Sequence, residues 1–303
     1  MELGRKGAGV MTAQPAQPTL SALVTGICDD AALFPPGNAP LAEALPARER
    51  HLSSAHADLV GPFVFPAGRL PELAEATFEG PLEVSLTVPG AAALAAAVAD
   101  LAAITGTSLA AVELAPGPEE SAQQVLQTLD AAALKAPVFV EIPRDDRRAD
   151  FLTRLAGTAY SAKFRTGGVT ADKYPDGAEL ASAVRSVVAA GIPFKATAGL
   201  HHAVRNTDPD TGFEQHGFLN ILLATHRALQ GADENALAET LAGRDGAAIA
   251  AALAALDGAQ QAAVRHSFQS FGTCSITDPL GELTGLGLIP QALITLETEG
   301  TNL

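Results

Sequence analysis

Short β-rich runs that end at Pro or Gly alternate with Ala- and Leu-rich runs along most of this chain. The strand-like runs are PFVFP, LEVSLTVP, AAVELAP, PVFVEIP, AYSAKFRTGG and IPFKATAG. Each is followed by a stretch with helical periodicity, such as AAALAAAVADLAAI. Because single helices between strands produce parallel sheets, this alternation predicts an α/β fold.

Two weaker segments decide between a closed barrel and an open sheet. Residues 23–28 (LVTGIC) could supply a first strand and FQSFGTCS a last one, although LSALVTG could equally form a helix. Eight alternating units predict a (β/α)8 TIM barrel, whereas six or seven would suit an open doubly wound sheet. We expect the barrel.

The length and hydrophobic content favour one large domain. The chain has 303 residues, of which 48% are hydrophobic. We expect residues 1–20 to be a disordered leader and residues 21–303 to form the barrel domain. A stretch of about 205–265 is too long for one crossover and has helical patterns at 216–230, 234–242 and 246–263, which predicts an inserted helical cap before the last strand.

Composition argues against several partner classes. Lys and Arg total 19 against 34 for Asp and Glu, without a basic stretch, so we expect no nucleic-acid partner. The longest apolar stretch, residues 84–99, contains polar residues, Pro and Gly, so we expect no membrane span. The N-terminus lacks an apolar signal-peptide region, and Cys28 and Cys274 have no metal or disulfide spacing. These features predict a cytoplasmic protein.

Charged side chains interrupt the predicted strands at Glu113, Glu141, Lys163, Arg165 and Lys195. Successive strand residues face opposite sides, and these five share the parity that points into the barrel. Active sites of such barrels lie at the carboxyl ends of the strands, so we predict that the five side chains share one pocket there. The alternative is an ion-pair network that only holds the strand register.

The two lysines in this set suggest a reaction. Lys163 and Lys195 lie on adjacent predicted strands at similar height. A second cation and partial desolvation favour a neutral amine, which can attack a carbonyl and form a Schiff base. Glu113 or Glu141 could then carry protons. For one of the two lysines we expect the simpler role of counter-ion to a glutamate.

The runs AKFRTGG, PFKATAGLHHAVR and FGTCS resemble the deoxyribose-phosphate aldolase group of class I aldolases. In that group a lysine strand ending in Thr-Gly precedes a Lys-x-x-Gly-Gly strand and then a Gly-Thr-Ser strand. An Asp at the end of the first strand and acidic residues in the fourth and fifth also fit. The resemblance implies that Lys163 forms the Schiff base, that Lys195 tunes it and that Glu113 assists proton transfer. We expect no cofactor.

The chain also departs from this family pattern. Arg165 stands where a small hydroxyl residue is expected, an Ala-Gly pair replaces Gly-Gly, and the helical insertion is additional. We therefore expect a different substrate, with a carboxylate or phosphate near Arg165. The backbones of Gly199, Gly272, Thr273 and Ser275 are a further candidate anion site, although such loops are more often simple turns.

Histidines after the seventh predicted strand support a competing hypothesis. His201, His202 and His216, with Glu141 or Asp29, could bind a divalent metal in a metal-dependent lyase or hydrolase. Their spacing matches no metal-binding motif, so we expect no bound metal and assign His201 to substrate binding or general acid/base work.

The segment CDDAALFPPGN is the other unusual stretch. Its prolines cannot continue a helix, so a stiff loop could bring Asp29 to the pocket; alternatively Asp29 or Asp30 caps a short helical turn. Taken together, the residues predict a lyase or aldolase-type enzyme that acts on a small anionic carbonyl compound through a lysine Schiff base. A non-catalytic barrel that binds a small metabolite is the other alternative, and homo-oligomer formation stays open.

Overall fold

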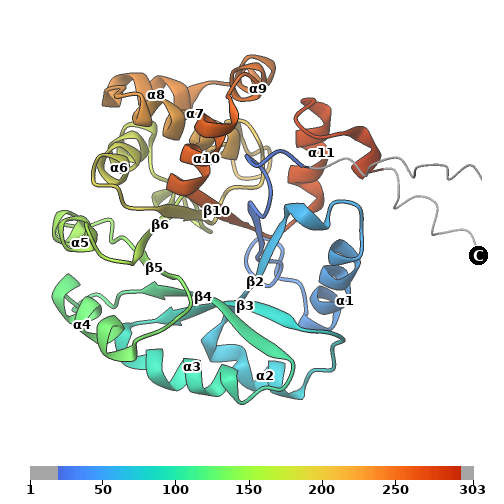
Figure 1. The fold of residues 1–303 in the computed structure, drawn as a ribbon, viewed down its shortest axis with the longest axis vertical. Helices are drawn as coiled ribbons and strands as arrows, with labels where there is room; N and C mark the ends of the chain where they lie inside the picture. The colour runs from blue at the N-terminus through green and yellow to red at the C-terminus, as the bar shows by residue number, and fades with distance from the viewer. Residues whose placement is uncertain (1–19, 295–303) are drawn as a thin grey trace, which may run out of the picture.

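The computed structural model describes residues 20–294, and its centre is a closed barrel of parallel strands in the order β1-β10-β7-β6-β5-β4-β3-β2 (Figure 1). The strands are β1 (Cys28–Asp30), β2 (Val60–Pro66), β3 (Leu82–Pro89), β4 (Thr107–Ala115), β5 (Val138–Glu141), β6 (Ser161–Arg165), β7 (Phe194–Thr197) and β10 (Phe268–Thr273). The predicted (β/α)8 barrel is confirmed. The predicted leader, residues 1–20, lies outside the described residues apart from Leu20.

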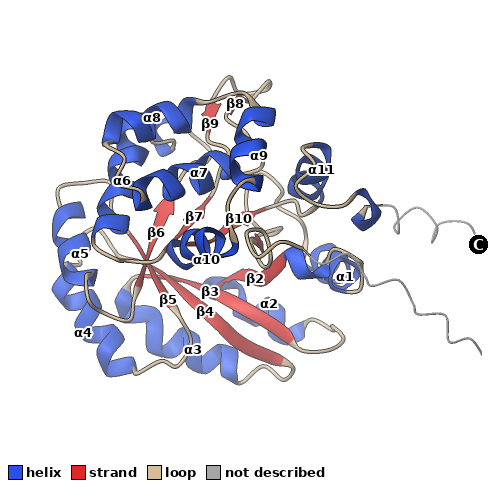
Figure 2. Cartoon of the chain, turned by 45° about the horizontal axis from the view of Figure 1, so that its top comes forward, coloured by secondary structure: helices blue, strands red, loops and turns tan. Residues whose placement is uncertain are grey.

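Helices surround the barrel on its outer side (Figure 2). They are α1 (Leu41–Leu52), α2 (Leu70–Glu75), α3 (Leu94–Ala102), α4 (Ala122–Ala132), α5 (Arg148–Leu155), α6 (Gly177–Ala189), α7 (Phe218–Leu229), α8 (Glu234–Ala242), α9 (Gly246–Ala254), α10 (Gly258–Ser267) and α11 (Thr277–Gly285). Short 3-10 helices occupy Ala57–Leu59, Ala67–Arg69, Ala91–Ala93, Ala171–Lys173 and Gln291–Leu293. Helix α4 begins with a capping box between Ser121 and Gln124, and α6 begins at Asp176, whose carboxylate accepts from the backbone of Glu179.

The first strand lies further along the chain than predicted. Residues 22–26 form turns, and the strand begins at Cys28 and includes Asp29 and Asp30. The amides of Val24 and Thr25 both donate to the Ser21 carbonyl, and Gly26 has a positive φ of 60°. This turn cannot continue as an extended strand, so the apolar side chains of this segment are buried without belonging to the sheet.

The long segment before the last strand contains helices, as predicted, and a two-stranded hairpin formed by β8 (Asn206–Thr207) and β9 (Glu214–Gln215). The single helix predicted for 246–263 is instead two helices, because Asp257 forms a capping box with Gln260 and starts α10. Helix α7 packs against α6, α8, α9 and α10 on the outer side. Within residues 20–294, no single helix has the length and apolar character to cross a membrane; only the bent pair α9–α10 meets that test jointly.

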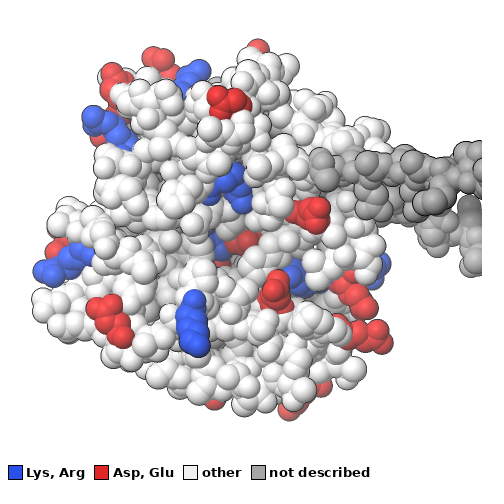
Figure 3. All heavy atoms as spheres, viewed as in Figure 1, with Lys and Arg blue, Asp and Glu red and all other residues white. Residues whose placement is uncertain are grey.

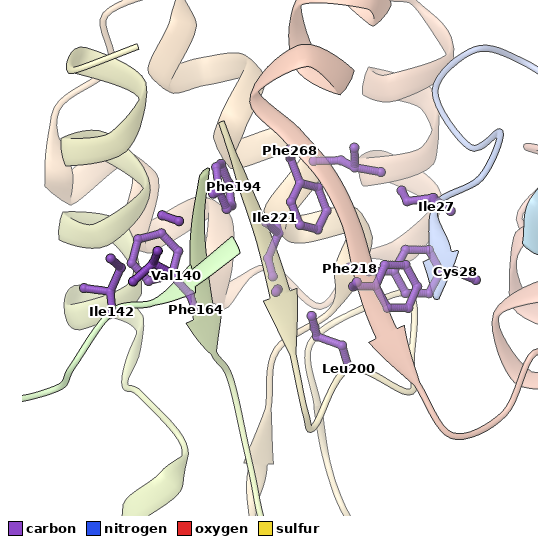
Figure 4. Packing of buried hydrophobic residues seen from close by; sticks show 14 of the residues in the cluster. Ile27, Cys28, Val140, Ile142, Phe164, Phe194, Leu200, Phe218, Ile221 and Phe268 are labelled. Carbon is purple, nitrogen blue, oxygen red and sulfur yellow. The ribbon is translucent and has the colours of Figure 1, made fainter. Parts of the chain in front are cut away.

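The main hydrophobic core lies between the barrel strands and the surrounding helices (Figure 4). Phe194 on β7 packs against Phe164 on β6 and Phe268 on β10, with ring centroids 5.7 and 5.1 Å apart. On the helix side of the barrel, Phe218 of α7 stacks on Phe271 of β10 at 4.6 Å. Phe164 and Phe194 take the outward parity of their strands, so the intervening residues of β6 and β7 point into the barrel. Phe268 and Phe271 both face the helices because the register of β10 shifts between them.

Truncation of Phe194 should test this packing. The ring is 1% exposed and joins three neighbouring strands, so we expect Phe194→Ala to lower the free energy of unfolding by about 3–5 kcal/mol. Val169→Ala is the matched control, because Val169 is 73% exposed and its truncation should change stability by at most about 0.5 kcal/mol. Urea denaturation of both variants makes the measurement. Equal losses in the two variants would contradict the assignment of Phe194 to the core.

Candidate active site

Six charged side chains form an alternating series of ion pairs inside the barrel, here called the interior ladder. Its members, in order of contact, are Asp29, Lys195, Glu113, Lys163, Glu141 and Arg165. They come from β1, β7, β4, β6 and β5, whose parallel register places Glu141 beside Lys163 and Lys163 beside Lys195. The structure therefore brings together the five charged residues that strand parity predicted to meet, and it adds Asp29.

Glu113 lies at the middle of the interior ladder. Its Oε1 accepts from Lys195 Nζ at 2.5 Å and from Ser85 Oγ at 2.8 Å, and its Oε2 accepts from Lys163 Nζ at 3.2 Å. The residue is 1% exposed. Burial alone would raise the Glu113 pKa, but the charges of Lys195 and Lys163 outweigh burial and lower that pKa to about 2. Glu113 is thus a permanently charged carboxylate at ordinary pH.

Lys195 is buried in the barrel and does not line the pocket. Its ammonium donates to both Asp29 and Glu113, and it lies 5.2 Å from the centre of the Phe139 ring. Burial alone would lower the Lys195 pKa, but the two carboxylates reverse that effect and raise it. Asp29 in turn accepts from Ser270 Oγ at 2.7 Å. Lys195 therefore acts as a fixed positive charge, the counter-ion role predicted for one of the two lysines.

Lys163 is paired in register with Lys195, and its side chain is 5% exposed. Its Nζ lies 3.2 Å from Glu113 Oε2 and 2.9 Å from Glu141 Oε2. Each lysine thus has two carboxylate partners, an arrangement that the sequence argument for a neutral amine did not include. Lys163 lines the cavity at the barrel mouth, whereas Lys195 does not. Of the two predicted reactive lysines, Lys163 is the one that a ligand can reach.

The cavity at the mouth measures about 460 Å³, a volume suited to a small molecule. Its apolar lining includes Phe34, Pro35 and Ala67, which follow β1 and β2, and Pro66 and Pro89, the last residues of β2 and β3. Its polar lining includes Glu113, Glu141, Lys163, Arg165, Lys173, Thr197 and His201. Seen from one face, the surface has basic and acidic atoms together near its centre (Figure 3).

Arg165 lies at the rim of this pocket. Its Nε donates to Glu141 Oε1 at 3.0 Å, and its side chain is 39% exposed. The Glu141 carboxylate therefore lies between Lys163 and Arg165. Burial alone would raise the Glu141 pKa, but the charges of these two cations lower it. The guanidinium of Arg165 is therefore accessible to a ligand while one edge of it is anchored.

The predicted backbone anion site is not assembled in the pocket. Gly272 lines the pocket, but Gly199, Thr273 and Ser275 do not. Gly199 packs against Gly167 and Tyr174, and the Ser275 amide donates to the Thr273 hydroxyl. Gly272 and Thr273 thus end strand β10, and Cys274 and Ser275 follow in a bend, so these backbones do not form one anion site.

Neither hypothesis for CDDAALFPPGN holds as stated, because Asp29 lies within β1 and not on the loop that follows it. Asp29 is 2% exposed and binds Lys195 beneath the pocket, so it supports the site from below and does not line the mouth. Asp30 accepts from the Ala32 amide at 3.2 Å, at a turn that does not start a helix, and it pairs with Arg48 at 3.5 Å. A Cβ on Gly61 would overlap Asp29 Oδ1, so the glycine leaves room for this carboxylate.

The three candidate metal-binding histidines have separate partners. His202 pairs with Glu282 at 2.6 Å, and His216 is buried against the Pro175 carbonyl at 2.8 Å. Burial lowers the pKa of His216 to about 4, so it is neutral at ordinary pH. Within residues 20–294, no three His, Cys, Asp or Glu side chains are grouped so as to hold a metal ion. Only His201 among the three lines the pocket.

Two pocket residues with titratable side chains were not predicted as site residues, Cys274 and Lys173. Cys274 lies 3.5 Å from His201 Nδ1, and burial raises the pKa of its thiol and lowers that of His201. Lys173 reaches the rim from the loop after β6, where its Cβ and Cγ pack against Gly168. The sequence did carry a signal for Lys173, because it follows soon after the strand that contains Lys163 and Arg165. Loops at the carboxyl ends of the strands form the mouth of such a barrel.

Removal of Lys195 should be costly and pH dependent. Lys195→Met leaves Asp29 and Glu113 buried without their shared cation, so we expect a loss of about 3–5 kcal/mol in the free energy of unfolding at pH 7. The difference in the free energy of unfolding between variant and wild type should shrink toward pH 4. Loss of the Lys195 ammonium raises the pKa values of Asp29 and Glu113, so both carboxyls can be protonated there and the unpaired buried charge is removed.

Denaturation curves at both pH values make this measurement, with Lys135→Met, a change at an exposed lysine, as the control. A Lys195→Met deficit that grows as the pH falls would contradict the assigned role.

Comparisons of the chain with protein-family models, curated proteins and solved structures found no match. The aldolase resemblance therefore rests on the short motifs themselves.

Proposed function

We propose that this chain is a lyase or aldolase-type enzyme that acts on a small anionic carbonyl compound through a Schiff base on Lys163. The observation that carries the proposal is the placement of one buried lysine amine in the wall of the mouth pocket, between two carboxylates. A lysine that only neutralised the two carboxylates would not need to line a cavity. Buried ionisable groups in a cleft are typical of catalytic sites.

Imine formation requires a proton to leave the Lys163 ammonium. Glu141 Oε2, 2.9 Å away, is placed to take that proton. The free amine then donates its electron pair to the carbonyl carbon, the carbonyl oxygen takes a proton from the nitrogen, and a carbinolamine forms. Glu141 returns its proton to the new hydroxyl, water leaves, and a protonated imine remains. Lysine ammonium and carbonyl thus give iminium and water.

The two glutamates have different roles in this scheme. Glu113 is 1% exposed and fully engaged by both lysines and Ser85, so it supplies a fixed negative charge. Glu141 has a side chain that is 17% exposed and lines the pocket, so it can exchange protons with a ligand. Once the iminium has formed, it can accept the electron pair of an adjacent C–C bond as a base removes the β-hydroxyl proton. Glu141 is the proposed base.

The anionic part of the substrate is assigned to Arg165. The guanidinium is anchored to Glu141 through Nε, and the side chain is 39% exposed at the rim of the pocket. A planar fork in that position suits a carboxylate or a phosphate oxygen pair.

Free thiols at Cys28 and Cys274 support the reducing cytoplasm as the place of action.

Reductive trapping tests the nucleophile. We expect borohydride treatment with a panel of small aldehydes and 2-keto acids to add the mass of one reduced adduct at Lys163, located by peptide mass spectrometry. Lys163→Met should abolish the adduct. Lys173→Met is the matched control, because Lys173 lines the same pocket, and it should retain labelling. Labelling confined to Lys173 or Lys195 would overturn the proposal, and absence of labelling across the panel would favour a non-catalytic binding barrel.

The role of Arg165 has a separate test. Arg165→Lys keeps the charge but loses the bidentate fork, so we expect the apparent affinity for an anionic 2-keto acid to fall about ten- to a hundredfold. Trapping yield as a function of ligand concentration measures this affinity. An uncharged aldehyde of similar size is the control, and its trapping should not change. An equal loss with both ligands would assign Arg165 to maintenance of the ladder alone.

A further inference from the structure

A second and larger cavity adjoins the mouth pocket. It measures about 800 Å³ and is here called the arginine groove. Its walls come from the loops after β4, β5 and β6 and from the first turns of α5 and α6. The groove and the pocket share Ala115, Glu141, Arg165 and Lys173 in their linings. A ligand that reached Lys163 could therefore continue past Arg165 into the groove.

Cations are concentrated in this groove. Its lining includes Arg144, Arg147, Arg148, Arg165 and Lys173, whereas the whole chain has only 19 Lys and Arg residues and a net charge of −15. A cluster of this kind is unusual on an acidic protein, because it creates a local region that attracts anions. The acidic residues in the lining are Glu141, Asp145, Asp172 and Glu179.

The pairing of these charges leaves one cation in excess. Glu179 accepts from Arg144 Nε and Nη2, both at 2.7 Å, and also lies 3.6 Å from Arg148 Nη1. One carboxylate thus serves two guanidinium groups. Arg147, in contrast, is neutralised by Asp145 at 2.7 Å, and its Nη1 donates to backbone carbonyls of the β4–α4 loop. The unbalanced charge therefore lies at Arg144 and Arg148.

We propose that the arginine groove is an anion subsite that binds a diphosphate-type group on the distal part of an elongated ligand, with Arg144 and Arg148 as its anchors. Placement of the ligand's other end, the carbonyl, at Lys163 rests on the proposed function. Arg148 contacts Glu179 only at 3.4 and 3.6 Å, so its guanidinium fork can hold an oxygen pair of an anion. Arg144 is held by Glu179 and donates to the Asp172 carbonyl at 2.6 Å, so it adds positive charge beside that fork. A single carboxylate would fill little of the volume, whereas a diphosphate has enough oxygens to contact Arg148 and lie beside Arg144.

The alternative is that these arginines only tie α5 and α6 together through Glu179. The two roles predict different effects of Glu179→Gln on anion binding. Removal of the shared negative charge should strengthen anion binding in a subsite, whereas in a purely structural cluster it should change stability without creating affinity.

Calorimetric titration with inorganic pyrophosphate, without divalent cations, tests the proposal on the full chain. We expect the wild type to bind, Arg148→Ala and Arg144→Ala to bind about tenfold more weakly or worse, and Glu179→Gln to bind several-fold more tightly. Arg154→Ala is the control, because Arg154 lies on the same helix as Arg148, pairs with Asp150 and does not line the groove. It should bind as the wild type does. Added NaCl should weaken binding in all of them.

Several results would overturn the proposal: no pyrophosphate binding by the wild type, an equal loss in Arg154→Ala, or no loss in a folded Arg148→Ala variant. Tighter binding of citrate than of pyrophosphate would overturn the diphosphate assignment. Thermal unfolding of each variant confirms that it is folded. The titration is independent of imine trapping, so binding of pyrophosphate together with failure to trap Lys163 would refute the proposed function alone.

Discussion

The ion pairs that Glu113 makes with Lys195 and Lys163 are the interaction on which the interior of the barrel depends. A carboxylate buried to this extent is tolerated only when cations and hydrogen-bond donors surround it, and Glu113 receives two ammonium groups and the Ser85 hydroxyl. These contacts join β3, β4, β6 and β7 across the barrel. The same contacts fix the height and direction of Lys163, so stability and the geometry of the candidate site have one physical origin.

The two lysines and the two glutamates of the interior ladder differ in how far they are buried. Lys195 does not line the cavity, whereas Glu113, Lys163 and Glu141 do. Glu113 is 1% exposed and is held by both lysines and Ser85, so Lys163 and Glu141 are the groups assigned to the proposed reaction. Arg165 stands at the junction between the mouth pocket and the arginine groove. The proposed supporting, reactive and anion-binding roles thus follow one another from the interior of the barrel toward solvent, the arrangement of barrel enzymes whose catalytic residues lie at strand ends.

The sequence predicted the barrel and its charged interior because both follow from local periodicity. Alternation along each strand gave the shared direction of Glu113, Glu141, Lys163 and Lys195. The contact between Asp29 and Lys195 could not be derived in this way, since it depends on closure of the barrel between β1 and β10. Lys173, Arg144 and Arg147 lie in the connections after β5 and β6, and Arg148 is the first residue of α5, so strand periodicity gives no direction for any of them.

Charge balance in the interior ladder restricts the products that Lys163 can form. The carboxylates of Asp29, Glu113 and Glu141 are matched by Lys195, Lys163 and Arg165, so the series is neutral as a whole. A protonated imine keeps the positive charge of the lysine and preserves this neutrality. Acylation of the same nitrogen would remove the charge and leave a buried carboxylate without its full set of partners. For the proposed reaction at Lys163, this charge balance favours aldehydes and ketones over activated esters, because the charge of the adduct differs between them.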